Sequence, residues 1–253
     1  MFHLLRLFPP MKKVLSNLLV VALWIAFMAV STAQNFRFGI KAGAGLANLD
    51  YAPLAASDMA PFDYYNGLWY DREKSSFGPA FLLGETIEYD LSKDFFLASG
   101  IQLTSRYAHV NVDEPTSNTN DFRLNLLHIQ LPLKLHYRAG KFFLGAGGYA
   151  SLGAGGKWKN TNTLISPNGT VTTETSGPVK FGKKLNESNM KRFDAGVGLE
   201  LGYGFKTIRL NLSYEGGIVN NLSPGIGPKE EKVNSRLYHQ VIYLTATYYW
   251  IKK

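Results

Sequence analysis

Few residues in this chain have types and spacings that could do chemistry. Among its five histidines, His128 and His136 fall on the same face of one alternating run, with Gln130 between them. If that run is a strand, the two histidines lie about 26 Å apart at ~3.3 Å per residue, which is too far to ligate one ion. We therefore expect no metal site and no cofactor.

A glycine-rich run from Gly145 to Gly156 has a superficial likeness to a phosphate-binding loop. It lacks the Lys-Ser/Thr pair of such loops, and no helix is expected after it. In a narrow barrel, small residues instead make room for large neighbours and let the wall bend. The chain has no cysteine, which excludes disulfides, thiolate zinc sites and an acylated cysteine at the N-terminus.

Ser105 and His109 raise the question of hydrolysis in a membrane, because an enzyme of that kind needs a serine and a histidine near one rim of a barrel. No recognisable nucleophile motif surrounds the pair. Polar residues are also ordinary at barrel rims. We therefore expect no catalytic residues and a protein that is not an enzyme.

The composition favours a single β domain. A length of 253 residues suits one large domain, and a hydrophobic content of 45% is too high for disorder. The 25 glycines and the aromatic content of 13% are typical of β proteins. The formal net charge of +8 is scattered among acidic residues rather than gathered in a stripe, so we expect no nucleic acid as a partner.

The N-terminus has the layout of a signal peptide. Two lysines precede an apolar run from Val14 to Val30, which ends in small residues that a signal peptidase accepts. We predict a signal peptide over residues 1–33 and one barrel domain over residues 34–253. An uncleaved membrane anchor is the alternative, and a start at Met11 instead of Met1 stays open.

From Phe36 onward, apolar and polar residues alternate with a period of two, as in strands that face lipid on one side and a lumen on the other. We predict an all-β fold, an eight-stranded antiparallel transmembrane β-barrel. The predicted strands are Phe36 to Leu46, Phe81 to Tyr89, Phe95 to Tyr107, Asn125 to Arg138, Phe142 to Leu152, Phe193 to Tyr203, Ile208 to Glu215 and Arg236 to Ile251.

Two residues disturb this pattern. Pro132 removes one hydrogen-bond donor from its strand, which predicts a local irregularity such as a bulge. Glu85 has the same parity as the apolar residues Phe81, Leu83 and Ile87, which would aim a carboxylate at lipid. A bulge or a different register would explain Glu85.

Short and long connections alternate along the chain, as they do in outer-membrane barrels with short periplasmic turns and longer extracellular loops. We therefore expect the cell outer membrane as the location, with both chain ends on the periplasmic side. The predicted short turns are Asp90 to Asp94, Arg138 to Lys141 and Gly204 to Lys206, and the predicted long loops are Ala47 to Gly78, His109 to Asp121, Gly153 to Met190 and Gly216 to Ser235.

Charged residues share the predicted lumenal face, and eight strands enclose a space just wide enough for side chains to fill. A filled lumen argues against an open pore. A narrow pore and a soluble lipocalin-like barrel, which buries apolar residues inside, are the alternatives. The expected lumenal network is Arg37, Lys41, Glu88, Arg106, Lys134, Arg138, Asp194, Glu200, Arg209 and Glu215.

Aromatic residues in the predicted long loops suit contact with a ligand or another protein, because an exposed ring can bind through both its face and its polar edge. Packing of these loops over the barrel mouth is the alternative. The candidate binding residues are Tyr64, Tyr65, Trp69, Tyr70 and Trp158.

Several segments together resemble the PorT-like outer-membrane β-barrel family of Bacteroidetes, a group of small OmpX-like barrels. The segments are Phe38 to Asn48, Glu88 to Leu97, Leu127 to Leu135, Phe142 to Tyr149 and Phe193 to Tyr203. The resemblance implies a barrel embedded in outer-membrane lipid. The family is named after a component of type IX secretion.

We expect a structural or binding role through long extracellular loops. The expected partners are outer-membrane lipid, the barrel assembly machinery during biogenesis, and an extracellular ligand or a secretion complex. A transport or secretion accessory is the alternative role.

Overall fold

The computed structural model describes residues 36–52, 73–113, 118–182, 190–221, 225–226, 232–233 and 236–250. The predicted signal peptide therefore lies outside the described residues. No helix in these segments is long and apolar enough to cross a membrane. The strands are β1 (Phe36–Ala52), β2 (Glu73–Ser76), β3 (Gly78–Asp90), β4 (Phe95–Ser99), β5 (Gln102–Asp113), β6 (Asn118–Ala139), β7 (Phe142–Ser166), β8 (Gly169–Pro178), β9 (Phe193–Gly204), β10 (Ile208–Gly217), β11 (Gly225–Ile226), β12 (Lys232–Val233) and β13 (Arg236–Tyr249).

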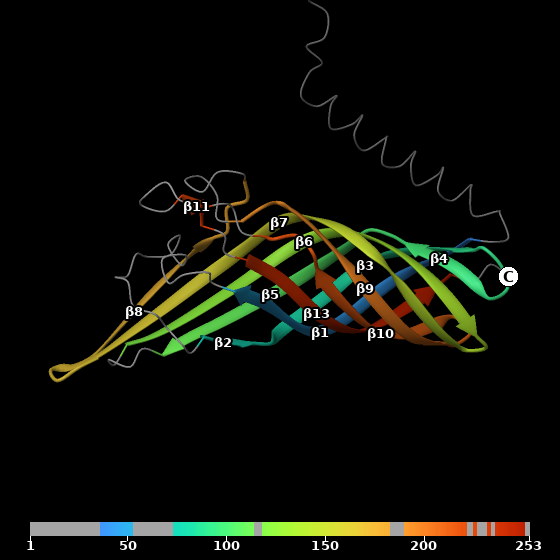
Figure 1. Cartoon of the computed structure of the whole chain (residues 1–253). Helices are drawn as coiled ribbons and strands as arrows, with labels where there is room; N and C mark the ends of the chain where they lie inside the picture. Colours follow the sequence, from blue (N-terminus) through green and yellow to red (C-terminus); the bar gives the residue numbers. More distant parts are fainter. Residues whose placement is uncertain are drawn as a thin grey trace, which may run out of the picture.

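Antiparallel strands close into a ring of eight positions, in the order β1, β3, β4 with β5, β6, β7, β9, β10 and β13. β13 pairs with β1 and so leaves the ring without an edge (Figure 1). β4 and β5 fill one position, because Ser99 opposite Leu133 and Gln102 opposite Gln130 keep one register on β6. The predicted eight-stranded antiparallel barrel is thereby confirmed.

The break between β4 and β5 lies opposite Pro132. Ser99 Oγ donates a hydrogen bond of 2.8 Å to the Pro132 carbonyl oxygen, so the edge of Pro132 that lacks an N–H faces this break. Gly100 occupies the break with a φ of 155°, and a Cβ there would lie 2.1 Å from the Glu85 carbonyl oxygen. The irregularity predicted at Pro132 is therefore in the neighbouring strand, and the register shift of β6 against β7 comes at His128.

Strand ends at the short turns lie within two residues of the predicted ends, but several strands continue further at the other end of the barrel. The predicted loop His109 to Asp121 is mostly strand, and the predicted loop Gly153 to Met190 contains the rest of β7 and all of β8. The extension of β7 and the whole of β8 are rich in Thr, Asn and Gly, and β8 is exposed along almost its whole length. They consequently lack the apolar period that marks a strand in the membrane.

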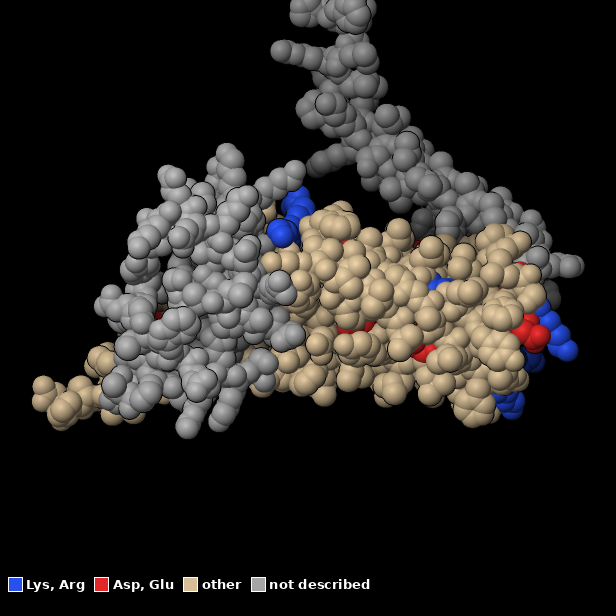
Figure 2. All heavy atoms as spheres, in the orientation of Figure 1, with Lys and Arg blue, Asp and Glu red and all other residues tan. Residues whose placement is uncertain are grey.

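The barrel wall is apolar outside and polar inside, the inverse of a soluble barrel. On β6, Leu133 is 55% exposed while the adjacent Lys134 is 5% exposed. Figure 2 shows a wall made mostly of residues other than Lys, Arg, Asp and Glu, with charged residues most numerous at the end that carries the short turns. The alternative of a lipocalin-like barrel with an apolar interior is therefore wrong.

Glu85 interrupts this apolar wall. It is exposed, lies opposite the exposed Ile40 of β1, and shares the outward face with Leu83. β1 and β3 keep an unbroken register from Phe36 opposite Tyr89 to Ala47 opposite Gly78. Neither a bulge in this pairing nor a shifted register turns the carboxylate inward, so Glu85 faces the lipid.

Three ring strands extend beyond the ring, and two further strands pair with them to form one sheet, which we call the protruding sheet. It consists of residues 107–113 of β5, 118–126 of β6 and 156–166 of β7, with β2 and β8. The hairpin of β7 and β8 forms its far end (Figure 1). Because the chain turns at the opposite end are short, the protruding sheet lies on the extracellular side.

Candidate functional sites in the lumen and on the protruding sheet

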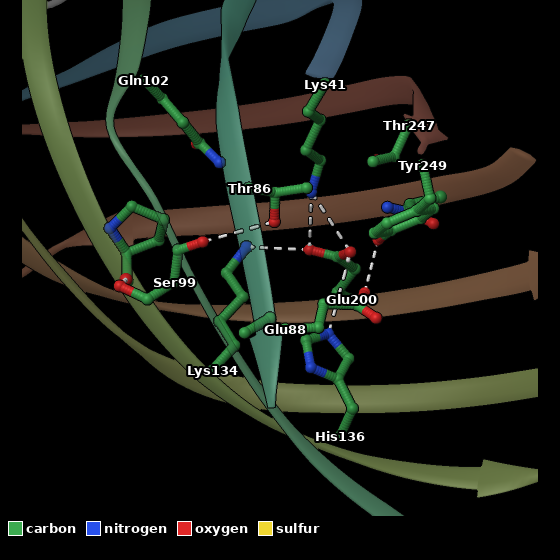
Figure 3. A pocket seen from close by; sticks show the side chains of 13 residues that line it. Lys41, Thr86, Glu88, Ser99, Gln102, Lys134, His136, Glu200, Thr247 and Tyr249 are labelled. Atoms are coloured by element: carbon green, nitrogen blue, oxygen red, sulfur yellow. Dashed lines mark hydrogen bonds and ion pairs between the residues drawn. The ribbon is translucent and has the colours of Figure 1, made fainter. Parts of the chain in front are cut away.

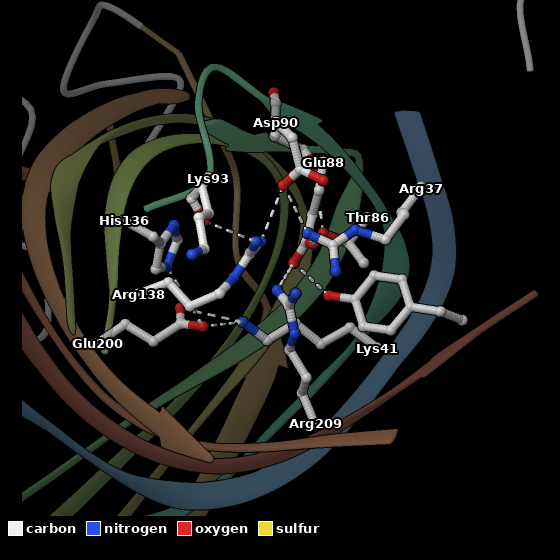
Figure 4. A network of polar contacts seen from close by, with 12 residues as sticks. Arg37, Lys41, Thr86, Glu88, Asp90, Lys93, His136, Arg138, Glu200 and Arg209 are labelled. Atoms are coloured by element: carbon white, nitrogen blue, oxygen red, sulfur yellow. Dashed lines mark hydrogen bonds and ion pairs between the residues drawn. The ribbon is translucent and has the colours of Figure 1, made fainter. Parts of the chain in front are cut away.

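The end of the lumen nearest the short turns is closed by arginines around two carboxylates (Figure 4). Glu88 pairs with Arg209 and, at 3.2 Å, with Arg37. Asp90, which sequence analysis did not include, lies 2.7 Å from Arg37 and 2.8 Å from Arg138. The shared carboxylates hold three guanidinium groups together across the barrel mouth.

In the middle of the lumen, Lys41 and Lys134 both contact Glu200 (Figure 3), and Lys134 also contacts Glu215. Lys134 Nζ lies 3.1 Å from both Glu200 Oε2 and Glu215 Oε1, and Lys41 Nζ lies 3.1 Å from Glu200 Oε2. Gln130 donates a further hydrogen bond of 2.9 Å to Glu215. These side chains come from β1, β6, β9 and β10, so the network ties opposite walls of the barrel together.

The extracellular part of the lumen is organised by Arg106 and Asp194, which are 2.5 Å apart and almost wholly buried. Ser151 bridges the pair, accepting from Arg106 at 3.1 Å and donating to Asp194 at 3.3 Å. His239 Nδ1 lies 3.5 Å from the same carboxylate, and His239 Nε2 lies 2.7 Å from the Tyr149 hydroxyl. All ten residues of the expected network thus lie inside the barrel in ion pairs.

A small opening lies among these side chains, between Lys41, Glu88, Lys134 and His136 (Figure 3). Its free volume is about 20 Å³, which is room for one water molecule. Within the described segments, no group of His, Asp and Glu side chains is placed to hold a metal ion. The geometry therefore suits a structural core better than a substrate site.

An apolar cluster lies at the extracellular end of the lumen, and we call it the apolar cap. Phe181 lies over Gly153, where a Cβ would come within 2.4 Å of its ring, and packs edge-on against His128 at 6.1 Å. Trp158, predicted as a loop residue, instead lies in β7 and packs against the cap. The cap consists of Ala108, Leu124, Leu126, Val179 and Met190 with Phe122, Trp158 and Phe181.

The other aromatic binding candidates, Tyr64, Tyr65, Trp69 and Tyr70, lie outside the described residues.

Sequence analysis did not predict the strand β8. It pairs with β7 on one side, ends the order of strands in the described sheet, and is exposed along almost its whole length. The turn formed by Pro167 and Asn168 between two Thr-rich runs was the available signal for this hairpin.

The structure separates Ser105 from His109. Ser105 Oγ accepts a hydrogen bond of 2.8 Å from the Phe81 N–H, whereas His109 Nε2 lies 3.1 Å from Asp121 Oδ2.

Partial burial raises the pKa of Asp121. Hydrogen bonds and charge from Arg123 and His109 outweigh burial, and the net pKa lies below the ordinary value of 3.8.

Residues 32–224 match the family described as outer membrane protein beta-barrel domain, and the chain belongs to this family. It is therefore a protein of the cell outer membrane. No curated protein sequence matches the chain.

Several solved outer-membrane proteins are similar to the chain. Ail, the attachment invasion locus protein of Yersinia pestis, is 11% identical with a TM-score of 0.34, covering 86% of this chain and 100% of Ail. Neisserial surface protein A is 10% identical with a TM-score of 0.36, covering 83% and 96%. OprG from Pseudomonas aeruginosa is 15% identical with a TM-score of 0.34, covering 86% and 95%. These proteins are too distant for any residue correspondence.

Proposed function

We propose that this protein is a binding module of the outer membrane, and that it binds an extended segment of an extracellular partner along the free edge of β8. The observation that carries the proposal is the exposed edge itself. A strand edge presents a row of backbone N–H and C=O groups, which pair readily with another extended chain.

The register of the hairpin identifies the backbone groups that face the partner. The Val179 N–H donates a hydrogen bond of 3.0 Å to the Gly156 carbonyl oxygen of β7. Because strand residues alternate in direction, the odd-numbered residues of β8 direct their N–H groups to β7 and the even-numbered residues direct theirs outward. Thr170, Thr172, Glu174 and Ser176 therefore present backbone donors that pair with no other strand in the described part of the chain.

The filled lumen and the apolar cap make a binding role better supported than transport. The resemblance to PorT-like barrels of Bacteroidetes supports a second proposal, a secretion accessory whose extended partner belongs to a secretion complex. The same resemblance, together with the layout of residues 1–33, supports export with loss of a signal peptide. Assembly into outer-membrane lipid by the barrel assembly machinery is part of this proposal.

The test uses a peptide-display library selected against the folded protein in lipid nanodiscs. Selected peptides are expected to bind the natural protein and the Thr172→Ala variant equally, because alanine keeps the backbone N–H. Thr172→Pro removes that donor without removing a bond to β7, so binding is expected to fall at least tenfold. Peptides that bind Thr172→Pro as well as the natural protein would show that the edge of β8 is not the site.

A further inference from the structure

Three polar side chains form a continuous hydrogen-bonded chain on the outer face of the protruding sheet. Ser76 Oγ of β2 lies 2.7 Å from His109 Nδ1 of β5, and His109 Nε2 lies 3.1 Å from Asp121 Oδ2 of β6. Ser76 is the direct cross-strand partner of His109. Sequence analysis had considered Ser105 with His109, and the structure puts Ser76 in that place.

The carboxylate fixes the protonation pattern of this chain. An ionised Asp121 only accepts hydrogen bonds, so it holds the imidazole proton on Nε2. His109 Nδ1 is then an acceptor for the Ser76 hydroxyl, which is the arrangement of a nucleophile, a general base and an orienting carboxylate. Arg123 holds Asp121 in place through contacts of 2.9 Å to Oδ1 and 3.0 Å to Oδ2.

The position of the three residues suits a substrate at the membrane surface. On β6 the outward apolar residues end at Leu127, and Arg123 on the same face is four residues further along. At ~3.3 Å per residue and a tilt of about 45°, Arg123 lies about 9 Å above the end of the apolar band. The side chains of His109 and Asp121 are each 24% exposed, so both contact solvent there.

We propose that Ser76, His109 and Asp121 hydrolyse carboxylic esters at the outer surface of the membrane. Ser76 Oγ attacks the ester carbonyl carbon while His109 Nδ1 takes the hydroxyl proton. The bond to the leaving alcohol then breaks, and the alcohol takes that proton from His109. Water attacks the acyl group on Ser76 and gives a proton to His109, which returns it to Ser76 Oγ as the acid leaves.

The test is labelling of the folded, lipid-embedded protein with a fluorophosphonate, which reacts with activated serines. The natural protein is expected to gain one label on Ser76, and Ser76→Ala is expected to gain none. His109→Gln is expected to slow labelling at least about 100-fold, the usual contribution of a general base. Ser105→Ala is the control and is expected to label at the natural rate, with folding of each variant checked by its heat-dependent gel shift.

Absence of a label on Ser76 in the folded natural protein would overturn the proposal, as would labelling that persists at full rate in His109→Gln. Hydrolysis is then measured with p-nitrophenyl butyrate and with phosphatidylethanolamine vesicles. Hydrolysis of the vesicle lipid would identify membrane lipids as the substrate class. Hydrolysis of the nitrophenyl ester alone would identify soluble esters as the substrate class. Turnover of neither would overturn the hydrolytic activity.

Discussion

Glu85 places a carboxylate on the lipid-facing side of β3, where charge destabilises a barrel by an amount that depends on depth. We expect Glu85→Leu to raise the free energy of unfolding by about 1–2 kcal/mol. Urea unfolding in lipid vesicles measures this change. Glu174→Leu, on the exposed β8, is the control and should change stability by less than about 0.5 kcal/mol. If Glu85→Leu instead lowers the free energy of unfolding, then placing the Glu85 carboxylate against lipid does not destabilise the barrel.

Arg106 and Asp194 form a buried ion pair, and removing one partner leaves the other charge uncompensated. We expect Asp194→Leu to lower the free energy of unfolding by about 3–5 kcal/mol. The double variant with Arg106→Met should recover most of that loss, because both charges are then gone. If the double variant is as unstable as the sum of the two single changes, the pair is not coupled as its geometry requires.

Asp121 predicts a pH dependence of the protruding sheet. Its pKa in the folded protein is below the ordinary value of 3.8, so its ionised form stabilises the fold above that value. This stability should be lost as the pH falls below 3.8 and through the lowered pKa. Carboxyl NMR shifts measure the midpoint, and Arg123→Gln should raise it. A midpoint at or above 3.8 in the natural protein would contradict the role of Arg123.

Individual residues differ in how far sequence could place them. The parity of Lys134 and Glu200 in their alternating strands indicates a lumenal side chain, although parity alone cannot identify which strands face one another. The contact of Ser76 with His109 depends on the pairing of β2 with β5, and β2 has only four residues. No local period in the sequence marks so short a strand.

At the scale of elements, the β7–β8 hairpin should be separable from the barrel. Removing residues 161–174 and joining Asn160 to Thr175 through Asn-Gly keeps a cross-strand pair at the new turn. We expect the heat-dependent gel shift to persist, because the removed residues lie beyond the apolar band, and peptide binding to be lost. Loss of the folded form would contradict a hairpin that is independent of the barrel.

Strand prediction was accurate where lipid imposes a period and poor where it does not. Ile208 to Glu215 was predicted almost to its observed bounds, since one face contacts lipid and the other the lumen. β7 extends to Ser166 rather than to Leu152, and the added residues lack the strict alternation of exposed and buried side chains that precedes them. The physical signal for a membrane strand ends where the membrane ends.

At the scale of the whole molecule, the ring, the lumenal network and the apolar cap form a continuous structural unit. Charges fill the lumen from Arg37 at the periplasmic end to Arg106 beside the apolar cap, where Phe181 packs against His128. The outward face contacts lipid. The barrel is therefore the structural part of the molecule, and the protruding sheet is the part that offers a surface for recognition.

Conductance in planar lipid bilayers tests that claim most directly. Purified, folded protein is expected to insert without giving unit conductance steps, because buried, paired side chains fill the lumen of so narrow a barrel. A porin in the same bilayer verifies that channels are detected. Stable, reproducible unit steps from the natural protein would contradict the claim, since they would show that the lumen is a path and not a core.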